Sequence, residues 1–173
     1  MAELLTYKEV PLGGQYSYLT TKVSPEDYDN VMRYIWCGSE SKHSGSICVF
    51  GYITEDQRGV YLSRFILDAQ KDVYVDHKNM DTLDNTRENL RVCTNSQNGA
   101  NSLSRGGTSD YKGVSWYKPR ERWQAQIMKN YKCYHLGLFD SELDAAQAYD
   151  KAAVKYFGEF ARLNFPFVGG QNG

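Results

Sequence analysis

The sequence is poor in features that would assign it to a membrane, secreted or strongly basic class. No run approaches the roughly eighteen consecutive apolar residues that a membrane-spanning helix requires. The first residues lack the basic and apolar regions of a signal peptide, so we expect a cytoplasmic protein with no membrane partner. The net charge is only −1, which by itself argues mildly against nucleic acid as a partner.

Cysteine and histidine are also scarce. The 4 cysteines lie far apart without a C-x-x-C pair, and the chain has only 3 histidines. A structural zinc site usually draws its ligands from closely spaced pairs of these residues, so the sequence argues against one. Buried, reduced thiols in an intracellular protein are the simplest interpretation of the cysteines.

The composition is otherwise that of a soluble globular chain. Hydrophobic residues make up 41% and aromatic residues 14%, which is enough to build a core and argues against disorder. A length of 173 residues allows one domain or two small ones.

The middle of the chain has a strand–loop–strand–helix pattern. An apolar run ends in Asp76-His77, a loop rich in Asn and Asp follows, and a second apolar run occupies residues 90–93. The capping box Thr94-x-x-Gln97 then predicts the start of a helix. Four polar side chains can face one another across this unit: Asp76, His77, Asn89 and Asn98.

These residue types suit the hydrolysis of a phosphodiester bond. A carboxylate and an amide oxygen are hard ligands for Mg²⁺, which keeps several waters and accepts phosphate oxygens as further ligands. A neutral imidazole beside them can take a proton from water near neutral pH, while the metal stabilises the leaving oxygen. The alternative interpretation is that Asp76-His77 only begins a polar loop and that the asparagines form turns.

The spacing and the strings D-N-T-R-E-N-L-R-V and S-Q-N resemble the HNH endonuclease motif. Asn89 follows His77 by 12 residues and Asn98 follows Asn89 by 9, similar to the form in phage and group I intron homing endonucleases. The resemblance implies that His77 is the general base and that Asn89 braces the loop. It further implies that Asp76 and Asn98 bind one divalent ion, Mg²⁺ or its substitute Mn²⁺.

Residues 1–70 show no catalytic pattern of their own and are interpreted as a scaffold. We expect a hairpin from residues 7–10 and 16–20, a helix that begins after Ser24, and strands at residues 47–53 and 59–67.

Many HNH relatives carry His-Arg where this chain has Ser63-Arg64, which removes an upstream histidine but leaves the four core residues complete. Arg64 is a candidate phosphate contact. Arg58 and Arg105 are weaker candidates, and a solvated surface is the simpler role for Arg58.

Charge is unevenly distributed along the chain. Residues 1–101 hold 10 basic and 14 acidic residues, whereas residues 111–137 hold 6 basic residues and 1 acidic residue. A local stripe of basic residues within a charge-balanced chain indicates a region that binds the phosphates of nucleic acid. The alternative interpretation is a solvated sheet face.

The same region predicts a three-stranded antiparallel sheet packed on one α-helix. Strands are expected at residues 111–117, 123–128 and 132–139, and strict alternation puts Leu138 on the same face as Leu136. A capping box at residues 141–144 begins a helix that ends near residue 157. The helix would cover one face of the sheet and leave the other for the major groove of DNA.

The strings Y-K-G-V, W-Q-A-Q-I, L-G-L-F and L-N-F-P within residues 111–166 resemble the ethylene-response-factor (Apetala-type) DNA-binding domain. Such domains also occur fused to HNH nucleases in phages. The plant domains place arginines where Ser115 and Met128 stand, so the target sequence does not carry over. By this resemblance the candidate DNA contacts, besides Arg64, are Lys112, Ser115, Tyr117, Lys118, Arg120, Arg122, Gln124, Gln126 and His135.

The sequence therefore predicts an α+β protein with an N-terminal mixed domain that contains an HNH ββα-metal motif. The expected divisions are a nuclease domain at 1–101, a linker at 102–110, the Apetala-type domain at 111–167 and a tail at 168–173. The predicted function is a metal-dependent DNA endonuclease of site-specific homing or nicking type.

Its expected partner is double-stranded DNA in the cytoplasm of a phage-infected or bacterial cell. No protein partner is evident, and the protein is expected to act as a monomer or a dimer. Two alternatives are a catalytically inactive, sequence-specific DNA-binding regulator and a nuclease of RNA. The RNA alternative is weaker because a sheet that reads a major groove suits B-form DNA better than A-form RNA.

Overall fold

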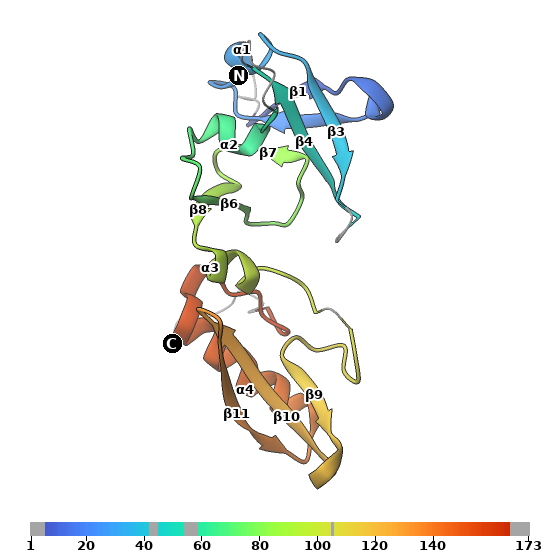
Figure 1. Cartoon of the computed structure of the whole chain (residues 1–173), viewed down its shortest axis with the longest axis vertical. Helices are drawn as coiled ribbons and strands as arrows, with labels where there is room; N and C mark the ends of the chain where they lie inside the picture. Colours follow the sequence, from blue (N-terminus) through green and yellow to red (C-terminus); the bar gives the residue numbers. More distant parts are fainter. Residues whose placement is uncertain (1–5, 42–44, 54–58, 105, 167–173) are drawn as a thin grey trace, which may run out of the picture. The chain divides into compact units, whose positions relative to one another are not determined.

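The computed structural model describes residues 6–41, 45–53, 59–104 and 106–166 of the chain. It contains helices and short strands in several small sheets, which confirms the α+β class (Figure 1). Arg58, Arg105 and the predicted tail at 168–173 lie outside the described residues. Within the described part of the chain, no helix is long and apolar enough to cross a membrane.

The chain divides into two compact units, Met1–Cys93 and Thr94–Gly173. This boundary falls just before the helix that ends the HNH-like pattern, whereas the sequence suggests a linker at residues 102–110. In the sequence, that helix follows directly on the two strands of the HNH-like pattern. In the structure, it belongs to the second unit.

The first unit is built from three small sheets. In spatial order, one consists of β1 (Lys8–Pro11), β2 (Thr20–Val23) and β7 (Asp84–Asn85). Another consists of β3 (Trp36–Glu40), β4 (Ile47–Tyr52) and β5 (Gly59–Tyr61). The third is an antiparallel ribbon of β6 (Tyr74–His77) and β8 (Leu90–Cys93). Between the strands lie η1 (Gly14–Tyr16), α1 (Tyr28–Val31) and α2 (Leu62–Ile66).

Three of the predicted elements in this unit differ from the observed ones. The second strand of the hairpin, expected at residues 16–20, is β2 at Thr20–Val23, and the residues before it form η1 and a turn. The helix expected after Ser24 is the single turn α1, because the Ser24 hydroxyl accepts the backbone N–H of Arg87 at 2.8 Å instead of capping a helix. The strand expected at residues 59–67 stops at Tyr61 and continues as α2. Leu62 and Ile66 are one helical turn apart and both are buried, so a helix puts both into the core.

One hydrophobic core holds the first unit together, and its largest buried side chain is Trp36. The indole N–H of Trp36 donates to the carbonyl of Val31 at 2.9 Å, which satisfies the one polar atom of the ring. Leu90 of β8 belongs to the same core and lies opposite His77 in the ribbon. The core therefore fixes the strand against which the end of β6 is paired.

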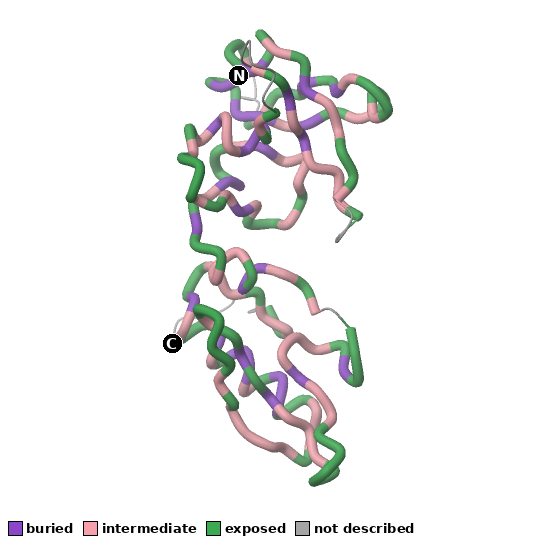
Figure 2. The backbone as a smooth tube through the Cα atoms, in the orientation of Figure 1, coloured by how far each residue is buried: buried purple, intermediate pink, exposed green. Residues whose placement is uncertain are grey.

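The second unit confirms the predicted sheet and helix. It consists of α3 (Asn95–Ala100), β9 (Val114–Tyr117), η2 (Lys118–Arg120), β10 (Arg122–Lys129), β11 (Lys132–Phe139), α4 (Glu142–Phe157) and η3 (Gly158–Phe160). The sheet order is β11-β10-β9, with both pairs antiparallel. Ala125 and Ile127 of the central strand are buried against α4, and the turn η2 is exposed (Figure 2).

A register shift corrects the predicted alternation of β11. Gln126 pairs with His135 and Ala125 pairs with Gly137, so Leu136 is an extra residue on β11. Beyond it Leu138 lies opposite Gln124, on the other face from the one that strict alternation predicts. Leu136 itself packs against the helix side.

Candidate functional site

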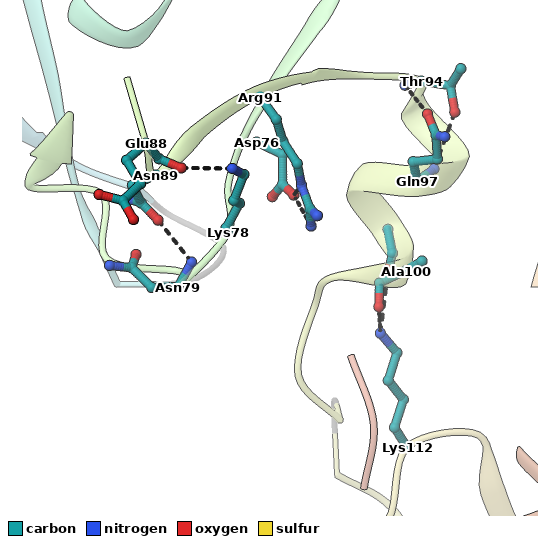
Figure 3. A network of polar contacts seen from close by, with 11 residues as sticks. Asp76, Lys78, Asn79, Glu88, Asn89, Arg91, Thr94, Gln97, Ala100 and Lys112 are labelled. Atoms are coloured by element: carbon teal, nitrogen blue, oxygen red, sulfur yellow. Dashed lines mark hydrogen bonds and ion pairs between the residues drawn. The ribbon is translucent and has the colours of Figure 1, made fainter. Parts of the chain in front are cut away.

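Asp76 is held in a buried ion pair at the end of β6. It lies opposite Arg91 in the ribbon, and Arg91 places Nε at 2.8 Å and Nη2 at 2.7 Å from Oδ2 of the carboxylate (Figure 3). The side chains of Asp76 and Arg91 are only 6% and 10% exposed. The fork geometry fixes the orientation of the carboxylate, and the pairing offsets part of the cost of burying its charge.

His77, the next residue, is oriented by a residue that sequence reasoning missed. Its Nε2 lies 3.1 Å from Oδ1 of Asn85, which comes from β7. The Asn85 amide nitrogen lies 2.9 Å from the hydroxyl oxygen of Thr21 and 3.1 Å from the carbonyl oxygen of Thr82. The parallel pairing of β7 with β2 brings Thr21 and Asn85 together, and both are almost fully buried.

The surroundings of His77 favour a neutral ring. Burial lowers the pKa of the imidazole below 6.5, because a low-dielectric site disfavours the charged form. The hydrogen bond of the ring to the Asn85 oxygen and the carboxylates of Asp76, Asp84 and Asp81 act in the opposite direction without cancelling that effect. At neutral pH the ring can therefore accept a proton, as a general base must.

Asn89 lies at the base of the loop between β6 and β8. Its Oδ1 accepts the backbone N–H of Asn79 at 3.0 Å (Figure 3). Its Nδ2 donates to the carbonyl of Asp84 at 2.7 Å. The backbone N–H of Lys78 also donates to the carbonyl of Asn89 at 2.9 Å. Asn89 is 7% exposed, so these bonds join two parts of the loop to the start of β8. They are the contacts that a loop-bracing residue would make.

Asn98 is carried by α3 in the second unit. The helix begins with the predicted capping box: the backbone N–H of Gln97 donates to the Thr94 hydroxyl, and the Gln97 side chain accepts the backbone N–H of Thr94. At its other end, the ammonium group of Lys112 donates to the carbonyls of Gly99, Ala100 and Ser102. The Ser96 hydroxyl accepts the backbone N–H of Asn130 at 3.0 Å. These bonds fasten α3 to the sheet unit.

Two of the basic residues predicted to bind DNA, Lys112 and Arg64, donate hydrogen bonds to backbone carbonyls of the chain itself. Lys112 holds the last two carbonyls of α3, those of Gly99 and Ala100, at 3.2 and 2.5 Å, and the carbonyl of Ser102 just after the helix at 2.6 Å. Arg64 donates to the carbonyls of Val73, Ala69 and Gln70 in the loop that follows α2. Because each cation is engaged by three backbone carbonyls, two of them through partly buried bonds, these roles compete with the phosphate contacts that the sequence suggests.

The open face of the sheet gathers most of the other candidates. Residues opposite one another in antiparallel strands share a face, and the pairs on the face away from α4 are Ser115 with Gln124, Tyr117 with Arg122, and Gln126 with His135. Gln124 Nε2 lies 3.1 Å from Nδ1 of His135 across this face. The face therefore presents amide, hydroxyl and imidazole groups of the kind that contact base edges.

Basic residues flank that face. Lys118 and Arg120 lie in η2 and are exposed. Arg122 forms a fork with Asp140, with Nε and Nη2 each 2.8 Å from a carboxylate oxygen. Because Asp140 is 88% exposed, this pair is an accessible one that phosphate can replace at little cost.

Three residues of the site lacked a predicted role: Asn85, Thr21 and Arg91. Asn85 stands within the quoted string D-N-T-R-E-N-L-R-V, and its only signal was an asparagine directly after an aspartate. Thr21 lies 64 residues earlier in the chain, and no local pattern connects the two. Arg91 lies in strand β8, and only the register of β8 against β6 shows that Asp76 is its partner.

Comparisons with known proteins agree with this geometry. The sequence profile described as HNH endonuclease matches residues 70–100, and the profile described as AP2 domain matches residues 109–159. An uncharacterized HNH endonuclease, L560, of Acanthamoeba polyphaga mimivirus is 32% identical over 149 residues, which cover 82% of this chain and 73% of that protein. The chain belongs to the HNH endonuclease family.

The second unit adds an AP2 domain, so the chain is a fusion of the two modules. The AP2-like ethylene-responsive transcription factor TOE2 of Arabidopsis thaliana is 44% identical over 61 residues, and APETALA2-like protein 2 of Oryza sativa subsp. indica is 43% identical over 61 residues. These matches cover 35% of this chain but only 13% and 14% of the plant proteins. The two modules indicate that the chain binds DNA.

Proposed function

We propose that this protein is a DNA endonuclease that hydrolyses one phosphodiester bond per active site and uses the AP2 domain to hold the DNA. The observation that carries the proposal is the pair Asp76-His77 within the matched HNH segment: a buried, oriented carboxylate beside a neutral imidazole. The family supplies the nuclease class, and these two side chains have the chemistry that hydrolysis requires.

The proposed cofactor is Mg²⁺, with Mn²⁺ as a substitute. The resemblance to the HNH motif assigns Asp76 as the carboxylate donor and Asn98 as the amide donor, and both would be hard donors of the kind that Mg²⁺ prefers. Among the described residues, no group of three or more His, Cys, Asp or Glu side chains is placed to hold a metal. Two protein donors would leave the other positions around such an ion to water and phosphate, as is usual for Mg²⁺.

In the proposed mechanism, the residues of the chain orient the water and receive its proton. His77 accepts the proton as the water attacks phosphorus, and burial of the ring keeps it neutral for that step. Asn89 holds the loop so that His77 and Asp76 keep their positions. A divalent ion, when bound, supplies the charge that stabilises the leaving oxygen.

We further propose that the open face of the β9–β11 sheet contacts double-stranded DNA. Ser115, Tyr117, Gln124, Gln126 and His135 would meet base edges, and Lys118, Arg120 and Arg122 would meet phosphates. Nicking is proposed because a protein with one active site cuts one strand at a time. A site-specific homing activity is proposed from the resemblance of the motif to those of phage and group I intron homing endonucleases. Double-strand cutting would then require two copies of the chain or a second binding event.

A second candidate function is a DNA-binding regulator without nuclease activity. The observation that favours it is the Arg91 fork on Asp76, since a carboxylate already neutralised by a guanidinium attracts a divalent ion less strongly. The two functions differ in one measurable property. Only the nuclease nicks supercoiled DNA, and only in the presence of a divalent metal.

The test of both proposals is a nicking assay on supercoiled DNA with Mg²⁺, with Mn²⁺ and with EDTA. The nuclease predicts conversion to open circles with either metal and none with EDTA. Retarded migration of the DNA without nicking under any of these conditions would support the regulator instead.

A further inference from the structure

Asn85 is a buried amide whose polar atoms all have partners. It is 1% exposed and lies on β7, paired with β2 in the interior of the first unit. A buried amide is costly unless its oxygen and both N–H groups are hydrogen-bonded. The arrangement of its partners consequently decides which way the amide points.

Thr21 determines the orientation of that amide. The Thr21 hydroxyl donates its one proton to the carbonyl of Leu83 at 2.7 Å, so toward Asn85 it can act only as an acceptor. The group 2.9 Å from this hydroxyl must then be the amide nitrogen. The other N–H of the amide faces the carbonyl of Thr82 at 3.1 Å. Both amide protons are thus used, and the atom that faces His77 is the oxygen.

The orientation of Asn85 in turn determines the tautomer of His77. An amide oxygen can only accept a hydrogen bond, so the imidazole Nε2 at 3.1 Å must carry the proton. This protonation is inferred from the hydrogen-bond partners. We propose that Asn85, locked by Thr21, is a positioning residue that holds His77 as its Nε2–H tautomer, so that Nδ1 is the atom that accepts the proton from water. The inference rests on the proposed role of His77 as general base.

A neutral amide suits this task better than a carboxylate. A carboxylate at the same place would orient the ring but would also stabilise the imidazolium and keep the base protonated. The amide oxygen orients the ring without placing a negative charge beside it. The reversed amide would instead point an N–H group at Nε2 and force the proton onto Nδ1, which is the arrangement that Thr21 and Thr82 oppose.

The tautomer can be measured directly on the full chain without metal. Long-range ¹H–¹⁵N spectra of protein labelled with ¹⁵N-histidine distinguish a protonated from an unprotonated ring nitrogen. The chain has only 3 histidines, and loss of one set of signals in His77→Gln identifies those of His77. The expected result is a single Nε2–H tautomer in the wild type and a mixture of both tautomers in Asn85→Ala.

Thr21 offers a matched pair of variants with smaller changes. Thr21→Ser keeps the hydroxyl and should keep the wild-type tautomer, whereas Thr21→Val removes the acceptor without opening a cavity and should admit the Nδ1–H form. If circular dichroism shows that Asn85→Ala does not fold, the Thr21 pair decides the question alone. An Nδ1–H tautomer in the wild type, or an unchanged tautomer in every folded variant, overturns the proposal.

Nicking kinetics separate this proposal from the proposed function. Asn85→Ala and Thr21→Val should lower kcat by roughly 10- to 100-fold, part of the contribution of a general base, and leave KM for DNA unchanged. If the wild type does not nick DNA, the proposed function fails while the spectra still report the tautomer. If the tautomer changes while kcat does not, Asn85 is no positioning residue for the reaction.

Discussion

Arg91 and Asp76 are joined across the β6–β8 ribbon by two contacts to one oxygen, Oδ2, with both side chains nearly buried. An ion pair in such a place contributes little net stability, but removing one partner leaves an unpaired buried charge. The pair therefore links the stability of the ribbon to the carboxylate that is proposed to bind the metal.

Replacing Arg91 by Met should destabilise the first unit by about 3–5 kcal/mol, because the Asp76 charge then loses its partner. The double variant Asp76→Asn/Arg91→Met should recover part of this loss, since it removes the charge as well. Urea denaturation followed by the amide signals of residues 74–77 measures both effects. A cost below about 1 kcal/mol for Arg91→Met would show that the pair is solvated.

Gly113 should tolerate no side chain. Its φ is +75°, and a Cβ would lie 2.0 Å from the ring of Tyr149. Gly113→Ala should therefore destabilise the second unit by at least about 3 kcal/mol and abolish DNA binding by the AP2 domain.

Gly106 provides the control for that variant. It has nearly the same φ, +76°, but a Cβ there would meet nothing within 4 Å. Gly106→Ala should cost only about 1 kcal/mol, the strain of a positive φ without a clash. Thermal unfolding of the two variants separates the backbone strain of a positive φ from the steric clash with Tyr149. Equal losses of stability in the two variants would contradict the packing of Tyr149 on Gly113.

Lys112 and Lys118 should differ sharply although both were candidate DNA contacts. Lys112→Met removes three bonds to carbonyls at and just after the C-terminal end of α3, so hydrogen exchange in α3 should become faster and the Tm should fall. Lys118 lies on the exposed turn η2, and Lys118→Met should leave the Tm unchanged. If Lys118 contacts phosphate, the plot of log K for DNA binding against log salt concentration should be less steep in Lys118→Met, by about 0.9 in the magnitude of its slope. An unchanged slope in Lys118→Met together with a less steep slope in Lys112→Met would show instead that Lys112, and not Lys118, contacts phosphate.

His77 should titrate below 6.5 in the metal-free protein, because burial disfavours the imidazolium. A histidine whose pKa is lower in the folded than in the unfolded chain contributes its full stability above the unfolded pKa, near 6.5. That contribution is lost as the pH falls from there through the folded pKa. An NMR titration of the His77 ring measures the value directly, and a pKa at or above 6.5 would contradict the buried, neutral ring.

The sequence predicted the second unit well because its signals are local. Alternating apolar residues in β10, the start of α4 at Ser141 and the capping box of α3 each depend on neighbours in the chain, and the structure contains all three elements. The prediction was wrong at Leu138, since a single extra residue on β11 reverses the alternation beyond it. The local sign of that bulge is Gly137, the next residue, whose φ of +145° favours a glycine inside a strand.

The first unit and the candidate site were harder to predict because they depend on distant pairs. The parallel pairing of β7 with β2 joins segments about 60 residues apart and brings Asn85 to Thr21. The motif spacing identified Asp76, His77, Asn89 and Asn98 as candidates, but the partners Arg91 and Asn85 emerge only from strand register. In the same way Arg64 and Lys112 look like surface cations in the sequence, and their backbone carbonyl partners are visible only in the fold.

The most direct test of the account compares the wild type with His77→Ala on supercoiled DNA, with nicking and DNA binding measured on the same samples. We predict metal-dependent nicking by the wild type, a loss of nicking by at least roughly 100-fold in the variant, and unchanged binding, because His77 is proposed to move a proton and the AP2 domain to hold the DNA. Nicking by His77→Ala at the wild-type rate would contradict the assignment of the base. Binding without nicking by the wild type in Mg²⁺ and in Mn²⁺ would contradict the nuclease itself.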